Sequence, residues 1–164
     1  MDDKLTILKE SLPKAMLQAL NPETKNAVPQ ALLRGDLVVI SRFPFKVGRE
    51  SRVVMIDSKL ERVERHKKDD TPPNNDLYLM DRCQRLNISR EHFQIEKNAA
   101  GYRLVDRGSA CGTKVEGVKV GGGNNGGSVE LQDGDVIAVG AAGTPYLFRF
   151  ITFDEYCLVR RDAS

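Results

Sequence analysis

Tryptophan is absent from this 164-residue chain, and histidine and cysteine are scarce, with two and three residues. The histidines, His66 and His92, do not form a zinc-type spacing with Cys83, Cys111 and Cys157, so we expect no metal site. The odd cysteine count and the lack of a Cys-x-x-Cys pair also disfavour a disulfide framework. We therefore expect free thiols in the reducing cytoplasm, and no cofactor.

Long apolar runs and a strong charge of one sign are lacking as well. No segment approaches the roughly 18 apolar residues that a membrane-spanning helix needs. The N-terminal Met-Asp-Asp-Lys is not a basic start followed by an apolar stretch, so we expect no secretory signal. The net charge of +2 is too small to favour nucleic acid, which needs a concentrated basic stripe. Neither a membrane nor a nucleic acid is therefore expected as a partner.

Short apolar segments are what the chain has in quantity. Hydrophobic residues make up 40% of it, enough to bury the core of one domain with a modest extension. Short β-branched or aromatic segments alternate with turn residues about every 8–12 positions, which is typical of an antiparallel β-sandwich. The expected strands are 37–40, 43–47, 77–80, 92–96, 102–106, 114–120, 128–131, 136–139 and 146–153. No long helical segment separates them, so a parallel α/β sheet is not expected.

Two regions differ from this strand pattern. Residues 1–36 carry apolar residues at helical spacing, which predicts a helical N-terminal extension that either packs on the domain or docks a partner. These apolar residues are Leu5, Leu8, Leu12, Met16 and Leu20. Residues 57–76 mix both charges and end in a cluster of turn-forming residues, which predicts a long exposed loop insert. Residues 37–153 are then the expected sandwich domain, and residues 154–164 a C-terminal tail.

Two features look like parts of a phosphate-binding or catalytic motif but lack the rest of it. The glycine-rich run 121–127 is followed by neither Lys-Ser/Thr nor a helix start, so we interpret it as a flexible hairpin loop. Cys111 lies between small turn residues, but outside the charged loop only His92 is available as a base. No strand-to-helix elbow follows the cysteine either. We therefore expect no enzymatic activity.

Four motifs lie in order at the ends of expected strands. They are Gly48-Arg49, Ser89-Arg90-Glu91-His92, Ser109-Ala110-Cys111-Gly112-Thr113 and the segment Leu131-Gln-Asp-Gly134-Asp135-Val-Ile137-Ala-Val-Gly140. Together they resemble the forkhead-associated (FHA) domain family, whose pattern is Gly-Arg, Ser-x-x-His, Ser-x-Asn-Gly-Thr and Leu-x-x-Gly-Asp-x-Ile-x-x-Gly. The resemblance covers about residues 37–153. It implies an antiparallel β-sandwich whose loops at one end bind phosphothreonine in partner proteins.

The resemblance also implies roles for individual residues at those loops. Arg49 would grip the phosphate, since its planar guanidinium offers forked, charged donors that a lysine cannot copy. Ser89 would donate its hydroxyl to a phosphate oxygen, and Arg90 would add a second cation. Arg82 and Arg85 would contact the phosphate or acidic flanking residues, with plain exposure to solvent as the alternative.

Further loop residues would contact the peptide backbone or support the site. The first group is Ala110, Cys111 and Gly112, and the second is Gly48, His92 and Thr113. In the family the histidine braces the binding loops by hydrogen bonds. Gly48 and Gly112 would permit tight backbone turns.

Two positions depart from the family pattern. Cys111 stands where the family has an asparagine that pairs with the backbone of the ligand, and a thiol donates and accepts hydrogen bonds poorly. Ala110 lacks the hydroxyl that some relatives direct at the phosphate. Each lost hydrogen bond costs ~0.5–1.5 kcal/mol, so losing both would weaken binding roughly 10- to 100-fold. The alternative function is a scaffold of the same fold that binds proteins without phosphate dependence.

The expected partner is a protein phosphorylated on threonine, such as a Ser/Thr kinase or its substrate. The expected role is the recruitment of such partners in Ser/Thr kinase signalling. A further hypothesis is that Thr24 or Thr71 is itself phosphorylated and bound by the same domain, in cis or between copies. Both threonines lie in segments that the sequence predicts to be exposed and rich in turn formers.

Overall fold

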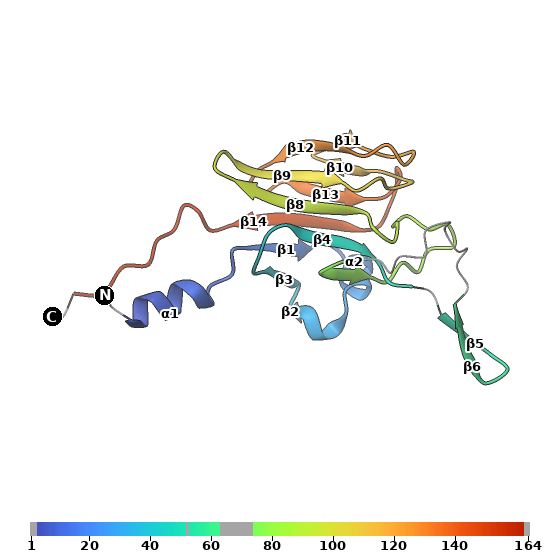
Figure 1. Ribbon diagram of the computed structural model, residues 1–164, viewed down its shortest axis with the longest axis horizontal. Helices are drawn as coiled ribbons and strands as arrows, with labels where there is room; N and C mark the ends of the chain where they lie inside the picture. The colour runs from blue at the N-terminus through green and yellow to red at the C-terminus, as the bar shows by residue number, and fades with distance from the viewer. Residues whose placement is uncertain (1–2, 52, 63–73, 163–164) are drawn as a thin grey trace.

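Two β-sheets packed face to face make up most of the molecule (Figure 1). The structure, a computed structural model, describes residues 3–51, 53–62 and 74–162. The first sheet has seven strands in the order β11-β10-β13-β14-β1-β3-β2. They are β1 (Ala15–Ala19), β2 (Leu33–Arg34), β3 (Leu37–Ile40), β10 (Thr113–Val115), β11 (Val118–Val120), β13 (Val136–Val139) and β14 (Leu147–Thr152).

The second sheet has five strands in the order β12-β9-β8-β4-β7. They are β4 (Phe45–Arg49), β7 (Leu77–Leu79), β8 (Phe93–Asn98), β9 (Gly101–Asp106) and β12 (Gly127–Leu131). Pairing among the described strands is antiparallel except between β4 and β7, which run parallel. The expected antiparallel β-sandwich is confirmed.

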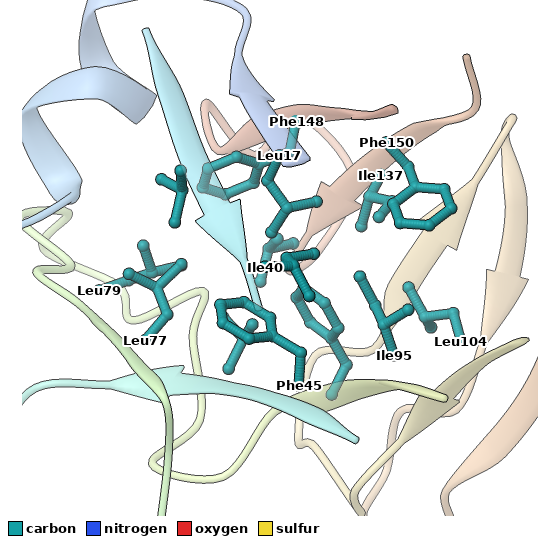
Figure 2. Close-up of a cluster of buried hydrophobic side chains, with 14 of the residues drawn as sticks. Leu17, Ile40, Phe45, Leu77, Leu79, Ile95, Leu104, Ile137, Phe148 and Phe150 are labelled. Atoms are coloured by element: carbon teal, nitrogen blue, oxygen red, sulfur yellow. The ribbon is translucent and has the colours of Figure 1, made fainter. Parts of the chain in front are cut away.

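The core lies between the two sheets and is filled by aliphatic and phenylalanine side chains from both (Figure 2). The labelled core residues are Leu17, Ile40, Phe45, Leu77, Leu79, Ile95, Leu104, Ile137, Phe148 and Phe150. In β1, β3, β7 and β13, buried and partly exposed positions alternate, as the two-residue period of a strand requires. Each such side chain contributes about 1.5–3 kcal/mol through burial.

The N-terminal region differs from its prediction. Two helices form, α1 (Asp3–Ser11) and α2 (Pro22–Ala27), followed by a short 3₁₀-helix at Gln30–Leu32. Residues 15–19, however, form strand β1, which pairs with β14 on one side and β3 on the other. The predicted helix is wrong here because Ala15, Leu17 and Ala19 fill the core at a strand period, and pairing on both edges outweighs local helical spacing.

Helix α1 buries none of its residues and lies to one side of the sandwich (Figure 1). Ile7 and Leu8 of this helix, and Leu12 just after its end, are 60%, 52% and 47% exposed, so these apolar residues are not buried against the domain. Among the described residues, neither helix has the length and apolarity of a membrane-spanning segment.

The predicted loop insert is partly a hairpin. Strand β6 (Lys59–Arg62) falls inside the segment 57–76 and pairs with β5 (Val53–Ile56), so the loop prediction is wrong for these residues. The expected strand over 114–120 is in fact the hairpin of β10 and β11. Glu116 and Gly117 break it, with φ of +48° and +78°, because a two-residue hairpin turn requires the left-handed region at both positions.

Thr24 is not the exposed threonine that the phosphorylation hypothesis requires. Its side chain is fully buried, and its hydroxyl donates to Pro145 O (3.0 Å) and accepts from Leu147 N (2.8 Å). The hypothesis is therefore wrong for Thr24, because a kinase cannot reach this hydroxyl. Thr71 lies outside the described residues.

Candidate functional site

Three segments that are far apart in the sequence meet at one end of the sandwich. They are the end of β4, the loop between β7 and β8, and the loop between β9 and β10. Arg49 N donates to Ser89 O (3.0 Å), and Arg49 Nε donates to Ile88 O (2.8 Å). Ala110 N donates to Ser89 Oγ (3.0 Å). Arg49, Ser89 and Ala110, which the sequence assigned to one site, are thus brought together.

Arg49 is held in a fixed orientation. The residue is only 6% exposed, and besides the bond to Ile88 its Nη1 donates to Glu50 O (3.3 Å). Two backbone carbonyls thus help to orient the guanidinium.

The Ser89 hydroxyl acts as an acceptor within the site, from Ala110 N. A hydroxyl carries one donor in addition to its acceptor lone pairs. Accepting this bond therefore orients the Ser89 oxygen while its own O–H stays able to donate to an anion.

His92 joins the two loops from beneath. It is fully buried; its Nδ1 accepts from Ser89 N (2.9 Å), and its Nε2 lies 2.8 Å from Gly112 O. A backbone N–H can only donate, so Nδ1 is unprotonated, and Nε2 carries the proton that it donates to Gly112 O. Burial lowers the pKa of His92, although the bond to Gly112 and the carboxylates of Asp106 and Asp81 oppose this. The ring is therefore neutral.

Because the pKa of His92 is lower in the folded chain, acid is expected to destabilise the fold. Below about pH 6.5 this histidine binds a proton in the unfolded chain but not in the folded chain. The free energy of unfolding therefore falls as the pH is lowered, with a limiting slope of about 1.4 kcal/mol per pH unit. Above that pH the contribution of His92 is fully present. Urea unfolding at about pH 7.5 and about pH 5.5 should show the loss in the wild type. His92→Asn, which has no titrating ring, should show a smaller difference; an equal loss in both proteins would contradict the assignment.

Asp106, at the end of β9, shapes the loop that carries Ala110 and Cys111. It is 4% exposed and accepts four hydrogen bonds: from Gly108 N (3.0 Å), Ser109 N (2.8 Å), Ser109 Oγ (2.6 Å) and Thr113 Oγ1 (3.0 Å). The Ser109 hydroxyl in turn accepts from Gly112 N (2.9 Å). One buried carboxylate thus fixes both ends of the loop 107–113.

The glycine-rich run 121–127 supports this same loop. Gly123 N donates to Ala110 O (2.9 Å) and Asn124 N to Ser109 O (3.0 Å). A Cβ at Gly121 would lie 2.4 Å from Asp106 Cγ, so only glycine lets the run approach this closely. The sequence suggested only a flexible hairpin loop between β11 and β12. In the structure the run also forms one wall of the candidate site.

Cys111 and Gly112 complete the loop. The Cys111 thiol is half-buried and donates to Leu86 O (3.5 Å), which ties the loop to the neighbouring loop 80–92. Gly112 has a φ of +82°, the left-handed region that favours glycine. The structure contains no disulfide between Cys83, Cys111 and Cys157.

Asp81 anchors the loop between β7 and β8 in a similar way. It is 6% exposed, and its Oδ2 accepts from Asn87 N (2.6 Å) and Ile88 N (2.9 Å). Its Oδ1 accepts from Cys83 N (3.1 Å) and the Tyr146 hydroxyl (2.9 Å). This network positions the backbone just before Ser89.

Gly48 lets another segment of backbone pack closely against it; it does not form the tight turn that the sequence suggested. It lies inside β4, where a Cβ would be 2.0 Å from Arg90 O and 2.6 Å from Asn75 Nδ2. Asn75 Nδ2 donates to that same carbonyl (2.8 Å), and Asn75 Oδ1 accepts from Arg107 Nη1 (2.6 Å). The missing side chain lets the Ser89–Arg90 backbone lie directly on the strand. Arg90 itself is half-buried.

Sequence reasoning missed the two buried aspartates and the role of the glycine run. A signal was present for Asp106, since Asp-x-Gly-Ser is a pattern in which the carboxylate bonds to backbone N–H groups two and three residues on. Asp81 follows a short apolar strand, but its partners come from distant Tyr146 as well as from its own loop. No local pattern predicts such a contact.

The comparison with protein families identifies the class of protein. The model of the family described as FHA domain matches residues 45–140, more than half of the chain. The chain therefore belongs to the FHA domain family, as its four motifs predicted. No curated protein matches this sequence.

Three solved structures are similar to this chain at low sequence identity. Mycobacterium tuberculosis EmbR in complex with a low-affinity phosphopeptide is 17% identical with a TM-score of 0.49, covering 92% of this chain and 29% of that one. The FhaA FHA domain complexed with the intracellular domain of Rv3910 is 18% identical with a TM-score of 0.44, covering 84% and 97%. An FHA domain of an Arabidopsis thaliana hypothetical protein is 20% identical with a TM-score of 0.47, covering 93% and 91%. The present chain thus spans under a third of the length of EmbR.

Proposed function

We propose that this chain is a non-catalytic module that binds phosphothreonine segments of partner proteins and recruits them in Ser/Thr kinase signalling. Membership of the FHA family supports the proposal. The observation that carries it is the meeting of Arg49, Ser89 and the loop 107–113 at one end of the sandwich. The cytoplasmic location stays a prediction from the sequence.

In this proposal the phosphate docks against Arg49, Ser89 and Arg90. A phosphorylated threonine carries about −1.5 to −2 charges and three acceptor oxygens, and it is bound best by charged, fixed donors. The carbonyls that hold Arg49 orient its guanidinium before the ligand arrives, which reduces the entropy lost on binding. Ser89 adds a neutral donor beside it.

The loop 107–113 meets the peptide backbone in this proposal, and it does so less tightly than an asparagine-bearing loop. Cys111 replaces the carboxamide with a thiol that already donates to Leu86 O (3.5 Å). Ala110 presents only a methyl group, and its exposed position leaves room for the peptide. Gly112 and Thr113 keep the loop in shape through their contacts with Ser109 and Asp106.

A scaffold that binds partners without phosphate is the second candidate. The observation that favours it is the exposed apolar surface at helix α1, formed by Ile7, Leu8 and the following Leu12, none of which is buried. Arg49 and Ser89 oppose it, because a drifted site has no need for a fixed guanidinium beside a hydroxyl. The same binding experiment separates the two.

The test is a calorimetric titration with a phosphothreonine peptide, its phosphoserine counterpart and the unphosphorylated peptide. We expect the wild type to bind the phosphothreonine peptide and Arg49→Lys to bind it at least about tenfold more weakly, because lysine keeps the charge but loses the fork. Arg149→Lys, at an exposed arginine on β14, is the matched control and should bind as the wild type does.

Thermal unfolding of each variant checks that the protein still folds when the buried Arg49 is replaced. Binding that ignores the phosphate, or that Arg49→Lys leaves unchanged in a folded protein, would overturn the proposed function. A partner captured equally by phosphatase-treated and untreated samples, and lost when residues 1–12 are deleted, would support the scaffold instead.

A further inference from the structure

Lys119 reaches the candidate site from the outer face of the seven-stranded sheet. The residue is exposed on β11, yet its side chain folds back over two glycines of the site loops. A Cβ at Gly122 would lie 3.1 Å from Lys119 Cε and 3.4 Å from Nζ, and a Cβ at Gly112 would lie 3.3 Å from Cε. The ammonium group of Lys119 therefore lies beside the loop that holds Cys111.

Two features explain this placement. Gly112 and Gly122 carry no side chains, so the space that their Cβ atoms would fill is open to the methylene stem of Lys119. On the neighbouring strand, Lys114 stands directly opposite Lys119 in the β10–β11 pairing. Like charges opposite one another repel, which favours turning the Lys119 ammonium away from Lys114 and toward the loop.

Lys119 is one of several cations around the site that have no acidic partner among the described residues. Lys119, Arg82, Arg85 and Arg90 form no ion pair in the described parts of the chain, whereas Arg107, in the adjacent network, pairs with Glu91 (3.0 Å). Arg85 directly precedes Leu86, whose carbonyl accepts from Cys111. Unpaired positive charge thus lies on both sides of the contact that joins the two loops.

We propose that Lys119 is a specificity-determining residue of this chain and that it selects phosphopeptides carrying an acidic residue beside the phosphothreonine. This inference rests on the proposed function, and it names a preference that the phosphate contacts alone do not create. A carboxylate on the Lys119 side of the peptide meets an ammonium with no competing partner among the described residues. A neutral residue there gains nothing from it.

The expected effect is that of an exposed ion pair. Such pairs contribute modestly because water and salt screen them, so we expect a two- to fivefold preference, on the order set by surface pairs, that shrinks as salt is added. The phosphate grip, in contrast, should dominate the affinity for both kinds of peptide.

The experiment compares two phosphothreonine peptides that differ only in their flanks, one with Asp and Glu and one with Asn and Gln. Each is titrated calorimetrically into the full chain as wild type, Lys119→Met, Lys119→Arg and Lys9→Met. Methionine keeps the stem that packs on the glycines and removes only the charge. Lys9, exposed on α1, is the control for loss of one positive charge anywhere.

We expect the wild type and Lys9→Met to prefer the acidic peptide, Lys119→Met to lose most of the preference, and Lys119→Arg to restore it. The neutral peptide should bind the wild type and Lys119→Met equally. Equal binding of both peptides by the wild type, or an undiminished preference in Lys119→Met, overturns the inference alone. Failure of the wild type to bind either phosphopeptide overturns the proposed function beneath it.

Discussion

Replacing Asp106 by alanine is expected to lower the free energy of unfolding by about 3–5 kcal/mol, because it leaves buried donors without an acceptor. The carboxylate accepts from two backbone N–H groups and two hydroxyls, all within the loop 107–113. Ser109 and Thr113 are fully buried, so water cannot replace what is lost. Phosphopeptide affinity should fall with stability, since the same loop presents Ala110 and Cys111.

Urea unfolding measures the change, with Asp133→Ala as the matched control. Asp133 is exposed and accepts a single bond, from Thr152 N (2.8 Å), so its loss should cost about 1 kcal/mol or less. An Asp106→Ala protein as stable as Asp133→Ala would show that Asp106 does not organise the loop.

A methyl group at position 48 is expected to be nearly as costly, at about 2–4 kcal/mol, through overpacking. Alanine there would place a Cβ 2.0 Å from Arg90 O and within 2.7 Å of the Asn75 amide. The Ser89–Arg90 backbone must then move off β4, and the bond from Arg49 N to Ser89 O must lengthen. Stability and phosphopeptide binding should therefore be lost together.

The control for Gly48→Ala is Gly134→Ala. Gly134 has a φ of +87° but nothing within 4 Å of an added Cβ, so alanine there meets backbone strain without a clash, at about 1–2 kcal/mol. Gly48 is not among the residues with positive φ, so its substitution tests the clash alone. If denaturant unfolding ranks Gly134→Ala as the more damaging change, close approach is not the reason for glycine at position 48.

These substitutions act on groups that position the site rather than on groups that meet a ligand. Arg49 and Ser89 come from different segments, and their separation depends on Gly48, Asp106 and the buried ring of His92. A site assembled this way is rigid before a ligand arrives, so that little ordering entropy is lost on binding.

The sequence determined the class of fold and pointed to the candidate site. In strand segments such as 136–139 and 102–106, buried and less buried positions alternate at a two-residue period, because successive side chains of a strand face opposite sides of the sheet. That Gly48-Arg49, Ser89 and the loop 109–113 share one end of a sandwich was implied by the resemblance of the four motifs to the FHA family. The motifs themselves are local patterns, which can be read without any long-range contact.

Only the tertiary structure decided what residues 15–19 form and what the glycine run does. The helical spacing of Leu12 and Met16 is outweighed by the pairing of β1 with two strands from other parts of the chain, β3 and β14. The run 121–127 supports the loop 107–113 through the approach of Gly121 to Asp106. In both cases the deciding contact joins separate segments of the chain, which local sequence periodicity cannot encode.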